Sequence, residues 1–194
     1  MKKRSKLRKR KRGHAASKQK ARGKVWILRL GHRIERDKRL STHCGLVARA
    51  FGAQKLVYTG EKDSGLEDSI NSVTKGWGGP FQIEHSESAR KLIKEWKGKS
   101  VHLTVYGIPV QKKIRTLRKE KSLLVIVGGE KVPPEVYQEC DFNISVTGQP
   151  HSEVAALAIF LHEYFMGEEL EKKFRKVQKR VVPQERGKKV ISNI

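Results

Sequence analysis

The segment Ser122–Gly129, "SLLVIVGG", is the most strand-like stretch of the chain. A short, continuous apolar run that ends at two glycines is typical of a strand covered on both faces of a sheet. The next residues, "VPPEVYQEC" (132–140), predict one or two helical turns that begin after Pro133. "FNISV" (142–146) predicts another strand. This strand–helix–strand order predicts a parallel pairing, and therefore the centre of an α/β fold.

The same alternation extends outward from this unit in both directions. Apolar runs predict strands and helical spacing predicts helices. We expect strands at 25–30, 55–60, 81–85 and 100–107, and helices over 41–51, 64–77 and 86–98, with a further apolar helix that follows the polar loop 147–152 and runs to Leu161. Residues 111–121 read as a short basic connector, and "KVQKRVV" (176–182) as an added edge strand. The prediction is a mostly parallel sheet with helices on both faces.

Charge is concentrated at the N-terminus. The 194 residues carry a net charge of +23, and residues 1–24 hold 13 of the 43 Lys and Arg without any acid. We expect this stretch to be a disordered basic arm, and residues 25–194 to form the domain, with a basic C-terminal segment from 170 to 194. The arm is either a solvated tail or a grip for phosphates. The body stays basic without it, which favours a nucleic-acid partner.

Several classes of protein are disfavoured. Cys44 and Cys140 belong to no Cys/His cluster, and the histidines are dispersed, so neither a disulfide framework nor a metal site is expected. No apolar run spans a membrane or forms a secretory signal, so we expect a cytoplasmic protein. The chain has no GxGxxG after a strand, no P-loop and no GxSxG.

Three loops at predicted strand ends combine glycine, proline and polar residues. They are 106–109, 128–133 and 146–152. In α/β sheets ligands bind at the carboxyl ends of strands, and glycines let backbone amides approach a ligand. Each loop alone is typical of a tight turn. Together they favour a compact ligand that is recognised mainly by backbone groups.

A charged segment, Arg33–Arg39, follows the strand at 25–30, and His43 and Arg49 lie beyond it. We expect a charged loop before a helix that starts at Ser41 or Thr42. It is either a solvated loop or, because it follows a strand end, a clamp for RNA phosphates. Arg49 interrupts an apolar helical pattern, so it is either half-exposed or directed at a site.

Seven collinear segments together resemble the archaeal tRNA cytidine 2′-O-methyltransferases of the SPOUT class. They are "LRLGHRIERDKRLSTH", "ARAFGA", "WGGPF", "VHLTVYG", "VGGEKVP", "GQPHSEVAALA" and "VPQERGKKV", and they span 25–190. The resemblance implies a C-terminal trefoil knot, a homodimer, and methylation of the ribose of a T-loop cytidine, position 56 of tRNA. It also implies S-adenosyl-L-methionine as cofactor, without metal.

The resemblance assigns roles to individual residues. Implied cofactor-binding residues are Leu103, Tyr106, Gly107, Val127, Gly128, Gly129, Glu130, Lys131, Val132, Val146, Thr147, Gly148, Gln149, Pro150, His151, Ser152 and Glu153. Implied catalytic residues are Arg33, Arg36, Asp37, Arg39, His43 and Arg49. An arginine stays protonated at neutral pH, so it stabilises a developing oxyanion better than it accepts a proton.

Two alternatives stay open at the level of the sequence. A non-enzymatic RNA-binding protein would account for the basic arm but not for the three glycine-containing loops. A SPOUT methyltransferase with another RNA target would account for both.

Overall fold

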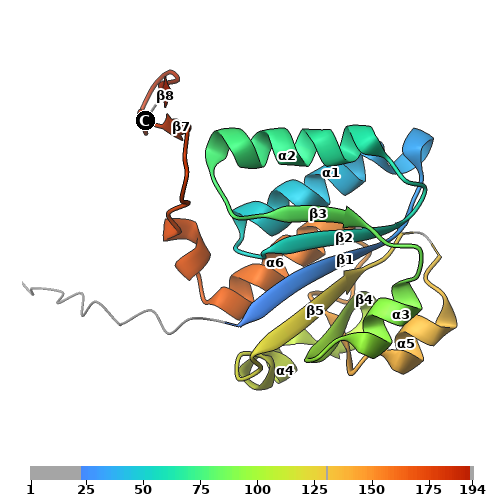
Figure 1. Cartoon of the computed structure of the whole chain (residues 1–194). Helices are drawn as coiled ribbons and strands as arrows, with labels where there is room; N and C mark the ends of the chain where they lie inside the picture. The colour runs from blue at the N-terminus through green and yellow to red at the C-terminus, as the bar shows by residue number, and fades with distance from the viewer. Residues whose placement is uncertain (1–22, 130, 193–194) are drawn as a thin grey trace, which may run out of the picture.

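The chain is described by a computed structural model that covers residues 23–129 and 131–192. Its centre is a six-stranded parallel sheet with the spatial order β3-β2-β1-β5-β4-β6 (Figure 1). The strands are β1 (Lys24–His32), β2 (Lys55–Gly60), β3 (Gln82–His85), β4 (Lys99–Pro109), β5 (Ser122–Val127) and β6 (Phe142–Ser145). The predicted α/β fold is confirmed, and β5, the run on which the prediction was centred, lies inside the sheet.

Helices cover both faces of the sheet, as the apolar runs predict (Figure 1). They are α1 (Ile34–Ala50), α2 (Ser64–Trp77), α3 (Ala89–Glu95), α4 (Val110–Leu117), α5 (Pro134–Glu139), α6 (Glu153–Phe165) and the 3-10 helix η1 (Glu168–Glu171). One core packs α1, α2, α4 and α6 on side chains such as Ile27 and Val125. A smaller core packs α3 and α5 on Leu28 and Ile126. Successive residues of each strand therefore supply opposite cores.

Helix α1 begins seven residues earlier than the sequence predicts, so the expected charged loop is wrong. Its N-cap residue Arg33 has an extended backbone and makes no side-chain capping hydrogen bond. Glu61, which follows β2, accepts a hydrogen bond from the amide of Ile34 at 2.7 Å. A free amide of the first turn is thus satisfied from a different part of the chain. Such a distant cap leaves no local signal in the sequence.

The basic connector predicted at 111–121 is also wrong, because most of it belongs to α4. Val110, Ile114 and Leu117 are buried on one side of this helix. Their spacing of four and three residues is that of an amphipathic helix, and the basic residues between them face solvent.

The added edge strand is wrong as well, because the C-terminal segment does not join the main sheet. Strand β7 (Lys179–Val181) pairs antiparallel with β8 (Val190–Ser192) in a separate hairpin (Figure 1). Across the part of the chain that the structure describes, no helix is long and apolar enough to cross a membrane. Most of the basic arm lies outside the described residues, and the trefoil knot stays a prediction.

Candidate cofactor and RNA site

All strands of a parallel sheet end at one edge, and two cavities lie at this edge. The first, which we call the β4–β5 cavity, has a volume of about 340 Å³ and lies between the ends of β4 and β5 and the start of α6. The second, the β1–β2 cavity, has a volume of about 710 Å³ and lies beside the start of α1. Gly129, just after β5, lines both. Both volumes are typical of ligand sites, which span about 300–1,000 Å³.

The β4–β5 cavity brings together parts of all three predicted loops. Nine predicted cofactor residues line it: Leu103, Tyr106, Gly128, Gly129, Val132, Val146, His151, Ser152 and Glu153. Lys131 lines the β1–β2 cavity instead. Gly107, Val127, Thr147, Gly148, Gln149 and Pro150 line neither cavity, and Glu130 lies outside the described residues.

Irregular pairing shapes the first loop of this cavity. Strand β4 pairs with β6 at Leu103 and again at Ile108, with a register shift between them. The intervening segment leaves the ladder, and Tyr106 is 84% exposed. Gly107 packs so closely on β6 that an added Cβ would lie 2.5 Å from the backbone of Ile144. Gly107 therefore shapes the loop through close packing, although it does not line the cavity.

Polar side chains of the β4–β5 cavity include some that the sequence did not reveal. His102 is buried, and its Nδ1 lies 2.9 Å from Oδ1 of Asn143, whose amide nitrogen donates to the carbonyl of Tyr137. The amide oxygen can only accept, so Nδ1 of His102 carries a proton. Burial lowers the pKa of His102, which favours the neutral ring. His102, Thr104, Val105, Tyr137, Ile144 and Ala156 are the lining residues that sequence reasoning missed.

In the third loop, His151 is the polar side chain that lacks hydrogen-bond partners. Both of its ring nitrogens are buried and have no hydrogen-bond partner among the described residues. The next residue, Ser152, caps α6 by accepting a hydrogen bond from the amide of Ala155 at 3.2 Å. Buried polar atoms are rarely left unpaired, so a lining histidine of this kind points to a polar ligand.

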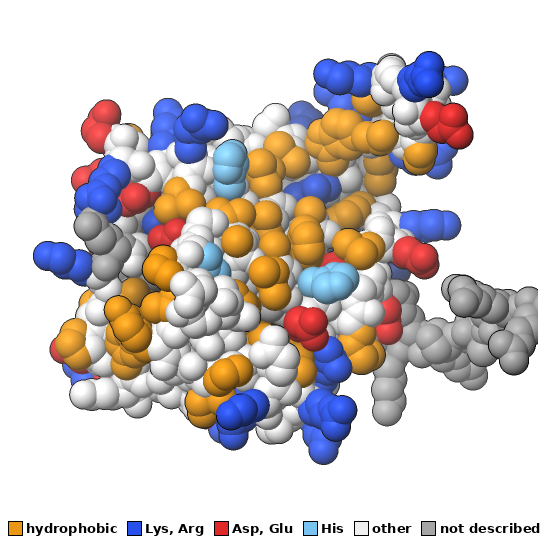
Figure 2. Space-filling view, turned by 180° about the vertical axis from the view of Figure 1, so that it is seen from behind, with side chains coloured by type: hydrophobic (Ala, Val, Ile, Leu, Met, Phe, Trp, Pro, Cys, Tyr) orange, Lys and Arg blue, Asp and Glu red, His pale blue; other side chains and the backbone are white. Residues whose placement is uncertain are grey.

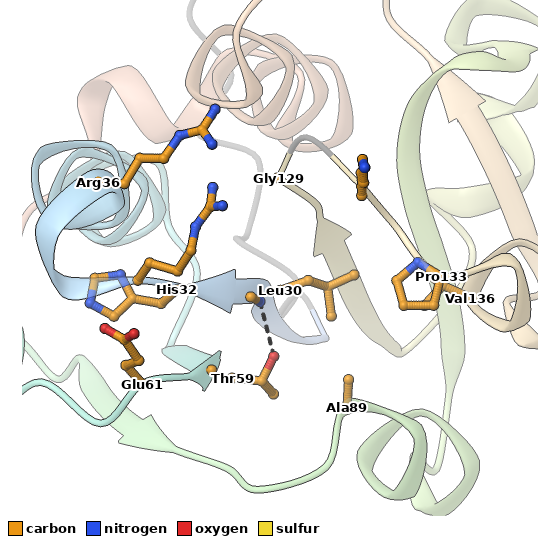
Figure 3. A pocket seen from close by; sticks show the side chains of 13 residues that line it. Leu30, His32, Arg36, Thr59, Glu61, Ala89, Gly129, Pro133 and Val136 are labelled. Carbon is orange, nitrogen blue, oxygen red and sulfur yellow. Dashed lines mark hydrogen bonds between the residues drawn. The ribbon is translucent and has the colours of Figure 1, made fainter.

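The β1–β2 cavity has a charged side, on which Arg33 and Arg36 outnumber Glu61, and an apolar side. Figure 3 shows Arg36, His32 and Glu61 on one side, and Ala89, Pro133 and Val136 facing them. At the floor of the cavity a hydrogen bond joins β1 to β2: the amide of Gly31 donates to Oγ1 of Thr59 at 3.2 Å (Figure 3). A cavity with cationic and apolar walls suits an anionic ligand that carries a flat apolar ring.

The first turn of α1 holds the two arginines at this cavity. Nε of Arg33 donates to Oδ2 of Asp37 at 2.9 Å, one turn along the helix. The hydrogen bond from Arg33 lowers the pKa of Asp37 and outweighs the opposite effect of burial. Arg36 and Arg33 line the cavity, whereas Asp37 is buried beneath them. Of the predicted catalytic residues, the structure thus brings these three together.

A buried polar network fixes His32 under the cavity. Its Nε2 lies 3.2 Å from Oδ2 of Asp63, and its Nδ1 lies 2.8 Å from Oγ of Ser41. A carboxylate can only accept, so Nε2 carries a proton. Asp63 also caps α2 through the amide of Leu66. His32 and Ser41 are fully buried, so this serine–histidine–aspartate set joins β1, α1 and α2 beneath the cavity.

Three other predicted catalytic residues lie away from both cavities. Arg39 and His43 are exposed on α1, three and seven residues after Arg36, so they continue its face of the helix. Arg49 lies at the far end of α1, about 24 Å along the axis from Arg33 at 1.5 Å per residue. It is buried there, and its Nη2 donates to the carbonyl of Gly78 at 2.6 Å. Within one chain, Arg49 therefore lines neither cavity, and its catalytic role stays a prediction.

Sequence reasoning missed most of the β1–β2 cavity. The residues it did not identify are Leu30, Gly31, His32, Thr59, Gly60, Glu61, Ala89 and Val136, whereas Pro133 belongs to the predicted loop 128–133. The sequence did carry a signal for this cavity, because Gly31 follows one predicted strand and Gly60 ends another. In the structure, Gly60 adopts φ +101°. The described residues contain no cluster of three side chains able to hold a metal ion.

Comparisons with known proteins agree with this geometry. A family model described as tRNA ribose 2′-O-methyltransferase, aTrm56, matches residues 77–191. The chain is 50% identical over 173 residues to the tRNA (cytidine(56)-2′-O)-methyltransferase of Thermococcus kodakarensis, covering 86% of this chain and 96% of that one.

Two solved structures share the fold. An A. aeolicus TrmH/SpoU tRNA modifying enzyme aligns with a TM-score of 0.56 and 18% identity, covering 77% of this chain and 78% of that one. The SpoU methyltransferase AviRb of Streptomyces viridochromogenes, crystallised with AdoMet, aligns with a TM-score of 0.55 and 13% identity, covering 75% and 58%. With the family match over more than half of its length, the chain belongs to the tRNA ribose 2′-O-methyltransferases.

Proposed function

We propose that this protein transfers a methyl group from S-adenosyl-L-methionine to the ribose 2′-hydroxyl of cytidine 56 in tRNA. The observation that carries the proposal is the pair of cavities that share Gly129 as a wall. One is enclosed by the three glycine-containing loops, and the other is lined by arginines. Two ligands bound on either side of one glycine can meet, as a group transfer requires. The family's curated relatives carry this activity in their names.

The residues of the β4–β5 cavity fit the cofactor. The unpartnered ring nitrogens of His151 and the cap of α6 provide polar contacts, while Leu103, Val132 and Ile144 provide apolar ones. When bound, the cofactor supplies an electrophilic methyl group on a sulfonium. Gly128 allows the second loop to fold tightly, because an added Cβ would lie 2.1 Å from Cγ2 of Val132.

The β1–β2 cavity is proposed to hold the target nucleotide. Arg33 and Arg36 would contact the phosphate and the ribose oxygen, and the apolar wall at Pro133 and Val136 would pack on the base. A guanidinium beside the ribose oxygen stabilises the negative charge that develops as the hydroxyl attacks. A guanidinium is a poor proton acceptor, so a water molecule or a phosphate accepts the proton of the hydroxyl.

Neighbouring surfaces extend this proposal to the whole tRNA. Arg39 and His43 continue the exposed face of α1 and would contact the RNA backbone outside the cavity. The basic arm 1–24, of which only Gly23 and Lys24 are described, would add phosphate contacts that weaken as salt rises. We further propose that the enzyme works in the cytoplasm.

A second copy of the chain is the proposed protein partner. Figure 2 shows apolar side chains gathered over the middle of one face, with Lys and Arg around them. Among the exposed large apolar residues of the described chain, Ile159 on α6 is 47% exposed and Ile108 on β4 is 45% exposed. Contiguous apolar patches of this kind mark interaction surfaces. Light scattering checks the proposal: a dimeric mass is expected, and a monomeric mass at micromolar concentration would refute it.

Labelled methyl transfer tests the proposed function. The protein is incubated with methyl-labelled S-adenosyl-L-methionine and an unmodified tRNA transcript, and the product is digested to nucleosides. We expect label in 2′-O-methylcytidine. Label in another nucleoside would identify a methyltransferase with a different target. Absence of label, together with tRNA binding and no cofactor binding by calorimetry, would favour a non-enzymatic RNA-binding protein.

A further inference from the structure

Arg29 is a fully buried arginine on β1 that the proposed reaction does not yet use. It follows Ile27 by two residues, so it faces the side of the sheet covered by α1 and α6. Its Nη1 donates to the carbonyl of Leu30, the next residue. Among the described residues, Nε and Nη2 have no hydrogen-bond partner. Arg29 therefore leaves most of its donors unused in a place that water does not reach.

The charge of Arg29 is not neutralised by a direct ion pair with any described residue. Its positive charge contributes to the low pKa of Asp37, but that carboxylate already accepts a hydrogen bond from Arg33. Cys44 lies within its electrostatic reach, and burial raises the pKa of this thiol to about 12, so it stays neutral. Buried charges are normally paired, and an unpaired one costs stability. The presence of Arg29 is therefore expected to lower the stability of the folded state.

The position of Arg29 links it to both cavities. A Cβ added to Gly129 would lie 3.4 Å from Nη1 and 3.6 Å from Nη2 of Arg29. Gly129 lines both cavities, and Leu30, whose carbonyl Arg29 holds, lines the β1–β2 cavity. The ladder between β1 and β2 shifts register between Arg29 and His32, and Gly31 adopts φ +62° there. Arg29 thus lies directly behind the wall at which the two ligands would meet.

We propose that Arg29 is a positioning residue for the transfer step, an inference that rests on the proposed function. In this step the ribose oxygen forms a bond to the methyl carbon and loses its proton to water. The bond between that carbon and sulfur breaks, and its electron pair goes to the sulfur. The charge of Arg29, acting through the Gly129–Leu30 wall, stabilises the negative charge on the ribose oxygen. Fixed charges in sites that exclude water are the most effective of such groups.

The test compares charge removal with charge retention at Arg29. Arg29→Met removes the charge, Arg29→Gln removes it but keeps a donor for the Leu30 carbonyl, and Arg29→Lys keeps it. Arg118→Met is the matched control, because Arg118 donates from Nε to the carbonyl of Glu163 at 2.9 Å, away from both cavities. Unfolding temperature, kcat and the KM for cofactor are measured for each variant, after wild-type transfer has been established.

Arg29→Met and Arg29→Gln are expected to lower kcat about 10- to 100-fold, below the loss for a direct oxyanion donor. Their KM is expected to stay within about threefold of wild type. Their unfolding temperature is expected to stay equal or rise by about 2–8 °C, because an unpaired buried charge is removed. Arg29→Lys should recover most of kcat. Arg118→Met should lower the unfolding temperature and leave kcat unchanged.

The opposite pattern would overturn the inference. Full kcat in Arg29→Gln, or equal kcat losses in Arg29→Lys and Arg29→Gln, would exclude a role of the charge. A fall in unfolding temperature like that of Arg118→Met, with unchanged kcat, would make Arg29 a purely structural residue. If the wild type transfers no methyl group, the proposed function fails, and that result is distinct from an active wild type with a fully active Arg29→Gln variant.

Discussion

Glu61 accepts a hydrogen bond at 2.7 Å from the amide of Ile34, so the end of β2 caps the helix that carries Arg33 and Arg36. The two residues are 27 positions apart in the sequence. This contact ties the start of α1 to the floor of the β1–β2 cavity, where Glu61 is also a lining residue. The orientation of both arginines therefore depends on a residue that follows another strand.

Removing this cap is expected to disturb the site more than the fold. Glu61→Ala should destabilise the protein by about 0.5–2 kcal/mol, the usual cost of a lost N-cap, and should lower methyl transfer more than about tenfold by loosening Arg36. Glu61→Gln, which can still accept, is the matched control and should retain most activity. Thermal unfolding and transfer assays measure both effects. Unchanged transfer in Glu61→Ala would contradict the proposed positioning.

Arg49 is expected to stabilise the fold and to have no direct part in catalysis. Its guanidinium donates to the carbonyl of Gly78 and lies 4.5 Å from the ring centre of Phe174, which ties α1 to the loop before β3 and to the C-terminal segment. Arg49→Ala should lower the free energy of unfolding by about 2–4 kcal/mol, since it leaves a buried carbonyl unpaired. Arg39→Ala, an exposed arginine on the same helix, should cost less than about 0.5 kcal/mol.

Chemical denaturation followed by circular dichroism measures these two costs. Below the unfolding transition, Arg49→Ala should transfer methyl groups at a rate close to that of the wild type. A stable Arg49→Ala protein that transfers none would restore the catalytic role that the sequence suggested, and would require Arg49 to act on the site of a second chain.

Asp63 should make the stability depend on pH in the acid range. Burial alone would raise its pKa, but hydrogen bonds from the Leu66 amide and His32 outweigh this and hold it below its usual value. A lowered pKa means that the contribution is complete above about pH 4 and is lost as the pH falls through the folded-state pKa. Asp63→Asn should be less stable than wild type at pH 7, and the difference should shrink towards pH 3 in denaturant titrations. A constant difference would refute this assignment.

The two cysteines should be inert in the folded protein. Burial raises the pKa of both Cys44 and Cys140 to about 12. Thiolates are the reactive species, so neither thiol should react with an aromatic disulfide reagent at pH 8 until the chain unfolds. In denaturant, both thiols should react with the reagent. Fast labelling of either residue in the native protein would show that the packing around it opens.

The sequence predicts most of the sheet, because its strands are buried on both faces and therefore read as unbroken apolar runs. It fails where a structural cause lies elsewhere in the chain. The start of α1 depends on Glu61, which no local pattern around Ile34 reveals. The apolar residues of α4 were obscured by the basic residues between them, although Val110 and Ile114 have helical spacing.

For the candidate site, the sequence predicts the three loops but not the position of Arg49 or the side chains that other elements contribute. Loops that follow buried strands must meet at one edge, so the three loops of the β4–β5 cavity could be anticipated from their order alone. The position of Arg49 was not predicted because the start of α1 was placed too late. A helix that begins at Ile34 carries Arg49 to the opposite edge of the sheet. His102 lies within β4 and Tyr137 within α5, and no local sequence pattern shows that these two elements pack together at the cavity.

Methylation of two tRNA transcripts that differ at a single oxygen atom shows whether the ribose 2′-oxygen of position 56 accepts the methyl group. One transcript carries cytidine at position 56, and the other carries 2′-deoxycytidine there. The protein and labelled S-adenosyl-L-methionine are added to each. We expect label to enter the first transcript, as 2′-O-methylcytidine, and not to enter the second. Equal labelling of the two transcripts would contradict this expectation, because the methyl group would then be going to an atom other than that 2′-oxygen.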